Sequence, residues 1–189
     1  TQAMPPDLIA AVLSAEDKSF CKHIGVDVRA LSRAILPNIS NMGSGRRPIG
    51  ASTITQQVAK NFLLTNEVSV ERKIKEAILA IRIEHALEKD DILALYLNDI
   101  YLGLSSYGVA AAALNYFDKP LDQLELHEIA YLAALPKAPN NYNPIRKTSS
   151  AIARRNWVLQ QMFLNGYISE DEKVYAQSFD LGVRAQTGS

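Results

Sequence analysis

The sequence contains one cysteine, Cys21, among its 189 residues. A single cysteine cannot form an internal disulfide, and there is no cysteine cluster to bind a metal. No paired base is evident beside Cys21 in the sequence, which disfavours a catalytic thiol. We therefore expect Cys21 to be a small, buried or half-buried apolar residue.

Long apolar runs and an excess of one charge are also missing. No stretch approaches the roughly 20 apolar residues of a membrane span, and no signal-peptide pattern opens the chain. We expect the chain itself to be soluble, and an anchor ahead of Thr1 is left open. Because Lys plus Arg and Asp plus Glu number 20 each, no broad basic field favours nucleic acid, and any anion site must be local.

The length and the helical patterns predict one mainly α-helical domain over residues 1–189. Hydrophobic residues make up 48% and charged residues 21%, which is typical of a globular protein. Period-two alternation is not convincing anywhere, apart from a candidate hairpin near 43–49. Apolar spacing and end signals predict helices over Leu8–Ala15, Asp27–Leu36, Ser52–Phe62, Ser69–Glu88, Asp90–Leu97, Tyr107–Phe117, Leu124–Leu135, Ser150–Asn165 and from Ser169 to about Ser178.

The segment "GASTITQQVAKNFLL" begins a helix at Ser52 and Thr53. Unpaired N–H groups at such a terminus, together with hydroxyl donors, are suited to bind an anion. Thr53, Gln56, Gln57 and Lys60 share one helix face that could line a cleft. The alternative is an ordinary amphipathic surface helix with a good N-cap.

The next helix contains "ERKIKEA", in which Arg72, Lys73 and Glu76 can meet on one face. Two cations held by a carboxylate could bind a phosphate or pyrophosphate, although a solvated charge cluster is the plainer alternative. Elsewhere on this helix, the spacing of Ile74, Ala77, Ile78 and Ile81 predicts one apolar face.

The segment "AEDKSFCKHIGVD" places two carboxylates at the end of an apolar helix. We expect Glu16 or Asp17 to be partly desolvated, and burial would make such a carboxylate a better base. His23 fits a structural histidine better than a ligand, because no second histidine or matching carboxylate spacing accompanies it. Phe20 is typical of a packing residue.

Five motifs in order resemble the peptidoglycan glycosyltransferase family, which includes the glycosyltransferase domains of class A penicillin-binding proteins and the monofunctional transglycosylases. They are "EDKSFCKHIGVD", "GASTITQQVAKNF", "RKIKEAILAIRIE", "KDDILALYLNDIYLG" and "AYLAALPKAPNNYNP". The resemblance implies a lysozyme-like, two-lobed helical fold with a cleft. It also implies polymerisation of lipid II into β-1,4 glycan strands with inversion, releasing undecaprenyl pyrophosphate.

The resemblance also implies roles for individual residues. Glu16 would be the general base, and Glu76 the second essential carboxylate. The residues implied in substrate binding are Asp17, Phe20, His23, Ser52, Thr53, Gln56, Gln57, Lys60, Asn61, Arg72 and Lys73. No cofactor is required by the sequence, and the family alone suggests a divalent cation, Mg²⁺ or Mn²⁺, at the pyrophosphate, with no metal ligands assigned.

The loop over Pro37–Gly50 matches a family segment that contacts the bilayer. Its membrane-contact candidates are Ile35, Leu36, Ile39 and Met42, with Arg46 and Arg47 near lipid headgroups; the alternative is a plain flexible loop. The resemblance places the protein at the outer, extracytoplasmic face of the bacterial cytoplasmic membrane. Its implied partners are lipid II, the growing glycan chain and other cell-wall synthesis proteins, with moenomycin as an expected inhibitor and no nucleic acid.

Two rival functions remain. A lysozyme or lytic transglycosylase would share the fold and use one or two carboxylates, but neutral glycosides give it no reason to place cations in the cleft. A catalytically silent helical binding module would tolerate the loss of both glutamates.

Overall fold

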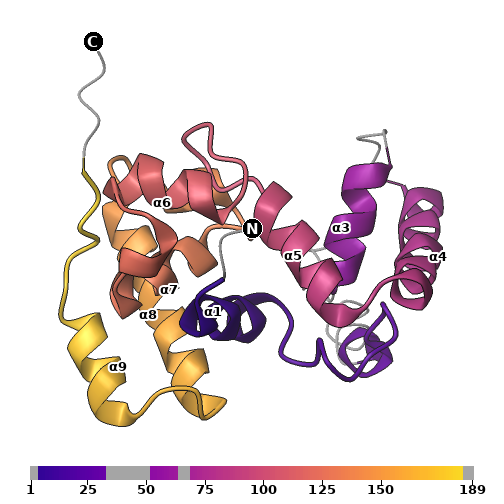
Figure 1. The fold of residues 1–189 in the computed structure, drawn as a ribbon, viewed down its shortest axis with the longest axis horizontal. Helices are drawn as coiled ribbons and strands as arrows, with labels where there is room; N and C mark the ends of the chain where they lie inside the picture. Colours follow the sequence, from indigo (N-terminus) through magenta and orange to yellow (C-terminus); the bar gives the residue numbers. More distant parts are fainter. Residues whose placement is uncertain (1–3, 33–51, 64–68, 185–189) are drawn as a thin grey trace, which may run out of the picture. The chain divides into compact units, whose positions relative to one another are not determined.

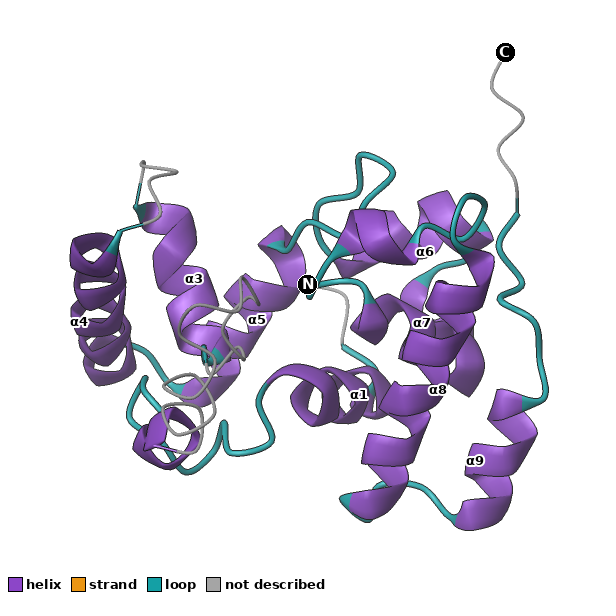
Figure 2. Ribbon diagram, turned by 180° about the vertical axis from the view of Figure 1, so that it is seen from behind, coloured by secondary structure: helices purple, strands orange, loops and turns teal. Residues whose placement is uncertain are grey.

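The computed structural model describes residues 4–32, 52–63 and 69–184, and the remaining residues are drawn in grey in Figure 1. Within these ranges the regular elements are helices (Figure 2). One isolated antiparallel bridge joins Tyr101 to Tyr107. The mainly α prediction is therefore confirmed. The prediction of one domain over residues 1–189 stays a prediction.

The chain divides into two compact units, as the two-lobed prediction requires. The first unit comprises Thr1–Lys18 and Leu97–Ser189, and the second comprises Ser19–Tyr96. Each unit therefore contains one of the two predicted catalytic glutamates, Glu16 in the first and Glu76 in the second.

The first unit is built around a helix that is buried on all sides. This helix, α7 (Leu126–Ala134), packs against α1, α6, α8 and α9. Most of its residues are small or apolar, and two buried polar groups have partners: Glu128 accepts from Lys119 Nζ at 2.8 Å, and Tyr131 Oη donates to the Tyr142 carbonyl oxygen at 2.8 Å. The surrounding elements are α1 (Pro6–Glu16), α6 (Val109–Phe117), η1 (Leu121–Gln123), η2 (Pro139–Tyr142), α8 (Thr148–Leu164) and α9 (Glu170–Gln177).

Local signals set the ends of these helices. Pro6 occupies the first turn of α1, where its missing N–H is not needed. Gly166 follows α8 with a φ of +79°, a left-handed conformation that favours glycine. Ser169 and Glu172 form the predicted capping box, with Glu172 N donating to Ser169 Oγ at 3.2 Å and Ser169 N donating to Glu172 Oε2 at 2.7 Å.

The second unit contains α3 (Ile54–Phe62), α4 (Val70–Ala86) and most of α5 (Lys89–Asp99). A helical segment at 28–32 follows Asp27, whose Oδ1 accepts a hydrogen bond from Ala30 N at 2.9 Å. This bond lowers the pKa of Asp27 and confirms its predicted capping role. The predicted continuation to Leu36 and the candidate hairpin near 43–49 lie outside the described residues.

The apolar face predicted on α4 is not the most buried side of the helix. Ile74 and Ile78 are 55% and 49% exposed, whereas Glu76 and Ala80 are 2% and 0% exposed. Close backbone approach explains the difference, because a Cβ on Gly25 would lie 2.7 Å from the carbonyl oxygen of Ala80. The side of α4 that faces Gly25 must therefore be small there, and the large apolar side chains point elsewhere.

Cys21 also departs from its prediction. The residue is exposed, in a turn that follows the buried Phe20. Phe20 fills the interior at this point of the chain, and its neighbour in the turn points outward.

Candidate functional site

Glu16 is the last residue of α1, an apolar helix whose Leu8, Ala11 and Val12 are buried. The Glu16 side chain is 10% exposed, and Asp17, which follows it, is 7% exposed. The prediction that this pair is partly desolvated is confirmed. Within the first unit, a largely buried carboxylate thus lies at the C-terminal end of α1.

Arg154 on α8 is the cation beside Glu16. Its Nη2 lies 3.8 Å from Glu16 Oε1, and its side chain is also 10% exposed. The guanidinium carbon lies 4.0 Å from the centre of the Trp157 ring and 5.9 Å from that of Tyr142. These cation–π contacts help to fix the position of the guanidinium.

Sequence reasoning missed Arg154. The only signal was a pair of arginines, Arg154 and Arg155, in a helix with an apolar face, and nothing in the pattern separates them. In the structure they do different work, since Arg155 is fully buried and donates to the carbonyl oxygens of Gln177, Phe179 and Asp180. Arg155 therefore ties the segment after α9 to α8.

In the second unit, Glu76 is buried on α4 and paired with Lys73. Lys73 Nζ donates to Glu76 Oε1, and it also donates to Ser52 Oγ at 2.7 Å. The Lys73 side chain is 49% exposed, whereas that of Glu76 is 2% exposed. The structure thus brings together three predicted site residues, with a buried carboxylate holding an accessible ammonium group.

Arg72 does not complete the predicted three-residue cluster by a direct bond. Its backbone N–H donates to Ser69 Oγ at 3.1 Å, which caps α4. Its side-chain Nε is buried and has no hydrogen-bond partner among the described residues. Arg72 is therefore a cation with unused donor capacity next to Lys73 in the sequence.

The N-terminus of α3 is capped by its own side chains, Thr53 and Gln56. Thr53 Oγ1 accepts from Gln56 N at 3.0 Å, and Gln56 Oε1 accepts from Thr53 N at 3.0 Å. Thr53 Oγ1 also donates to the carbonyl oxygen of Gly25 at 2.6 Å, and both side chains lie in residues that are at most 3% exposed. These bonds agree with the alternative of a well-capped helix, and substrate binding by Thr53 and Gln56 stays a prediction.

The other predicted residues of α3 are spread along the helix. Gln57 is half-buried, and its Oε1 accepts a hydrogen bond from Tyr96 Oη at 3.2 Å. Lys60 and Asn61 are exposed in the last turn, about 10 Å along the helix axis from Thr53. Their roles in substrate binding also stay predictions.

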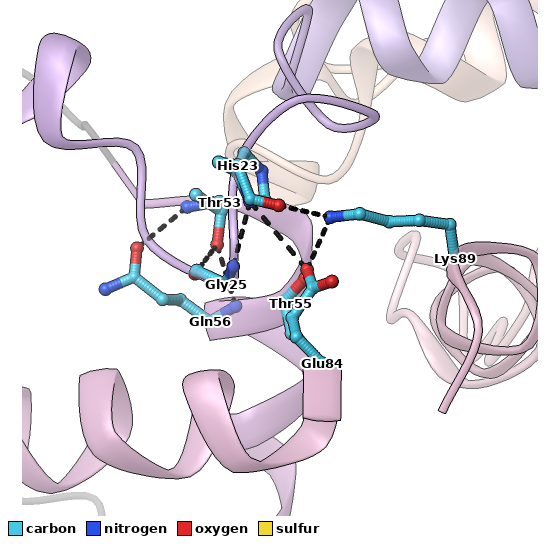
Figure 3. Close-up of polar contacts among 7 residues, drawn as sticks. All are labelled: His23, Gly25, Thr53, Thr55, Gln56, Glu84 and Lys89. Carbon is cyan, nitrogen blue, oxygen red and sulfur yellow. Dashed lines mark hydrogen bonds and ion pairs between the residues drawn. The ribbon is translucent and has the colours of Figure 1, made fainter. Parts of the chain in front are cut away.

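Glu84 forms the centre of a polar cluster that sequence reasoning missed (Figure 3). Its Oε1 accepts from Thr55 Oγ1 at 2.6 Å and from Lys89 Nζ at 2.7 Å. His23 Nδ1 lies 3.7 Å from the same oxygen, and Lys89 Nζ also donates to the His23 carbonyl oxygen at 2.8 Å. The cluster joins the segment after Lys18 to α3, α4 and the start of α5.

His23 and Phe20 contact the other residues of this cluster. His23 Nδ1 accepts from Gly25 N at 3.1 Å, so the imidazole holds the turn at Gly25. Phe20 is 2% exposed, meets the His23 ring edge-on and lies 4.5 Å beneath Lys89 Nζ. Glu84 is a carboxylate near His23 that the sequence pattern did not indicate, and the preference for a structural histidine fits the bond from Gly25.

The described side chains do not fit a divalent cation. Among them no group of three or more His, Cys, Asp and Glu side chains is placed to hold a metal ion. Glu76 is the carboxylate of the predicted pyrophosphate cluster, and its Oε1 already accepts from Lys73. The divalent cation that the family suggests therefore stays a prediction.

The membrane-contact candidates Ile35, Leu36, Ile39 and Met42 lie outside the described residues. Of the helices in the described part of the chain, none combines the length and the apolar character needed to cross a bilayer.

Comparison with known proteins adds a family. The model of the family described as "Transglycosylase" matches residues 1–163. Penicillin-binding protein 1A of Rickettsia felis is 54% identical over 89% of this chain and 21% of its own length. Penicillin-binding protein 1A of Aquifex aeolicus is 48% identical over 97% of this chain and 25% of its own length.

A solved structure is also similar. Penicillin-binding protein 1A from Haemophilus influenzae is 36% identical, with a TM-score of 0.46 over 74% of this chain and 18% of the other. The chain thus spans a fifth to a quarter of the length of the curated relatives named above.

Proposed function

Because this chain belongs to the transglycosylase family, we propose that it is a peptidoglycan glycosyltransferase that polymerises lipid II into β-1,4 glycan strands. The names of its relatives, penicillin-binding proteins 1A, support a role in cell-wall synthesis. Family, helix content and the two compact units agree with the lysozyme-like class.

The observation that carries the proposal is the setting of Lys73. A pyrophosphate leaving group needs charge neutralisation more than protonation, so it calls for fixed and accessible cations. Lys73 is half exposed, and its ammonium group is held by the buried Glu76 and by Ser52 Oγ. Neutral glycosides carry no pyrophosphate, and a glycan-cleaving enzyme would gain nothing from this arrangement.

Glu16 is the general base in this mechanism. Its carboxylate takes the proton from the 4-hydroxyl of the acceptor sugar, and the oxygen attacks the anomeric carbon of the growing chain. A new glycosidic bond forms as the bond to undecaprenyl pyrophosphate breaks, with inversion at that carbon. The leaving pyrophosphate keeps the bonding electron pair, and Lys73, Arg72 and the Ser52 hydroxyl stabilise its charge.

Glu76 positions Lys73. Because its buried carboxylate binds Lys73, it fixes the ammonium group and offsets its charge before the substrate arrives. Loss of Glu76 is expected to weaken donor binding as well as turnover.

Membrane location completes the proposal. Lipid II carries a polyprenyl chain, so the protein works at the outer face of the bacterial cytoplasmic membrane, in contact with other cell-wall synthesis proteins. Ile35, Leu36, Ile39 and Met42 would contact the bilayer, and moenomycin would compete with the donor.

Polymerisation of lipid II by a Glu16→Gln variant tests the proposal. The variant keeps the shape of the side chain and removes the base, so kcat is expected to fall by roughly 10²–10⁴-fold. Glu170→Gln is the matched control, because Glu170 is a 71% exposed glutamate in the same unit and should leave the rate unchanged.

A parallel incubation with finished peptidoglycan separates the rival enzyme. Release of soluble glycan fragments without lipid II polymerisation would favour a glycan-cleaving enzyme. Polymerisation by Glu16→Gln at the unmodified rate would overturn the role of Glu16.

A further inference from the structure

Arg154 is the group that the proposed mechanism leaves unused. It is a nine-tenths buried arginine on α8, and its Nη2 lies 3.8 Å from Oε1 of Glu16, the proposed base. Both residues belong to the first unit, in which α1 packs directly against α8. The pair therefore rests on a helix contact within one compact unit.

Among the described residues, two aromatic rings contact the Arg154 guanidinium. Trp157 and Tyr142 lie at 4.0 Å and 5.9 Å from the guanidinium carbon to their ring centres. The Arg154 Nε is buried and has no hydrogen-bond partner among the described residues. A charge that is fixed by packing keeps its direction whether or not a substrate is bound.

The distance suits an electrostatic role. The 3.8 Å between Arg154 Nη2 and Glu16 Oε1 is too long for a hydrogen bond, so this contact leaves the oxygen's lone pairs able to accept a proton. Arg154 acts on the carboxylate through its charge, which is worth more in a desolvated setting than at an exposed surface.

Burial has opposite consequences for the two partners. Burial lowers the pKa of Arg154, and the Glu16 carboxylate and Tyr142 oppose that change. An arginine nevertheless stays protonated in proteins. Burial by itself disfavours the charged form of a carboxylate, whereas a cation at this range favours it, and only the charged form can accept a proton.

The groups around Glu16 come from several elements. Asp17 follows it on the chain, Arg154 faces it from α8, and Tyr142 of η2 faces the arginine. On α7, which also packs against α1, the titratable residues have other contacts: His127 with Glu125, Glu128 with Lys119, and Tyr131 Oη with the Tyr142 carbonyl oxygen.

We propose that Arg154 is the positioning residue of the general base, holding the Glu16 carboxylate in its ionised form and fixing its direction. The inference rests on the proposed function, because it needs Glu16 to act as a base. Arg154 comes from the C-terminal part of the chain, and it acts on the reaction through Glu16 without needing to touch the substrate.

The pH dependence of lipid II polymerisation tests the inference. In Arg154→Met the acidic limb of the kcat/KM profile should move up by about 1–2 pH units, since an opposite charge shifts a carboxylate by that order. Turnover at neutral pH should fall and recover partly at higher pH, with KM changing less than kcat. Arg154→Lys keeps a charge and should hold the limb near its original position.

Arg146→Met is the matched control, because Arg146 is an exposed arginine just before α8 and should leave the profile unchanged. An unshifted acidic limb in a folded Arg154→Met variant would overturn the inference. An unshifted limb in Arg154→Met together with an inactive Glu16→Gln would exclude the role of Arg154 only. The proposed function would then still stand.

A ¹³C NMR titration of the Glu16 carboxyl group gives a measurement without substrate. In the unmodified chain, Glu16 should be ionised at neutral pH, and its midpoint should rise in Arg154→Met. This readout decides the matter even where a neutral variant folds poorly, because a midpoint above about 6 in the unmodified chain would show that Arg154 does not keep the base ionised.

Discussion

The helix contacts at the centres of the two units differ in their share of polar groups. In the first unit, α7 and α8 bury mainly apolar side chains, among them Ile129, Leu132, Val158, Leu159 and Met162, although Glu128 and Arg155 are buried there too. In the second unit, α3 packs on α4, and the buried residues there include Thr55, Gln56 and Glu76, with the Glu84 side chain 8% exposed.

The difference shows what specifies each unit. Apolar contacts are tolerant of small changes in angle, whereas hydrogen-bonded carboxylates fix one arrangement and are costly when they lose a partner. The second unit, which contains the proposed pyrophosphate cluster, should therefore depend on a few polar residues far more than the first does.

Replacing the centre of the polar cluster should have the largest effect on stability. Glu84→Leu removes the acceptor of Thr55 Oγ1 and one of the two acceptors of Lys89 Nζ. Breaking a buried pair typically costs about 3–5 kcal/mol of unfolding free energy, and we expect the lower part of that range because Lys89 is 28% exposed. Urea unfolding measures the loss, and amide hydrogen exchange should locate it in α3 and α4 and leave α7 protected.

Glu71→Leu is the matched control for that variant. Glu71 lies on the same helix and also pairs with a lysine, Lys75, but both side chains are exposed, so its loss should leave the unfolding free energy nearly unchanged. Equal losses in the two variants would contradict a special role for the polar cluster.

Two glycines sharpen the comparison at the backbone. Gly25 has a φ of +98°, and an added Cβ would lie 2.7 Å from the Ala80 carbonyl oxygen, whereas at Gly166, with a φ of +79°, nothing lies within 4 Å. Gly166→Ala should cost about 1–2 kcal/mol for the left-handed conformation alone. Gly25→Ala should cost more, because the α4 backbone must also move.

Thermal unfolding of the two glycine variants checks the order. If Gly166→Ala were less stable than Gly25→Ala, the close approach of Gly25 to the α4 backbone would not add to the cost of a side chain at position 25.

The sequence predicted the first unit well because its signals are local. Capping by Ser169, the stop at Gly166 and the apolar runs of α6 and α7 each act within a few residues, and the predicted ends agree with the structure within two residues. Glu16 could likewise be singled out, because a carboxylate ending an apolar helix is a local pattern.

The partners of the site residues could not be predicted in this way. Arg154 meets Glu16, and Glu84 meets His23, across long stretches of chain, and helical periodicity carries no information on such pairs. For the same reason, helical periodicity did not identify the buried side of α4. That side is set by contacts with Gly25 and α3, which are distant in the sequence, and not by the largest apolar residues.

The exposed isoleucines of α4 offer the smallest effect and the most direct check of that correction. Ile78 is 49% exposed, so Ile78→Ser should lower the unfolding free energy by less than about 1 kcal/mol. Ala80 is fully buried against the Gly25 segment, so Ala80→Val, although it adds only two methyl groups, should cost about 1–3 kcal/mol through overpacking. Urea denaturation of both variants decides between the two faces, since the reverse order would restore the isoleucine side as the packed face of α4.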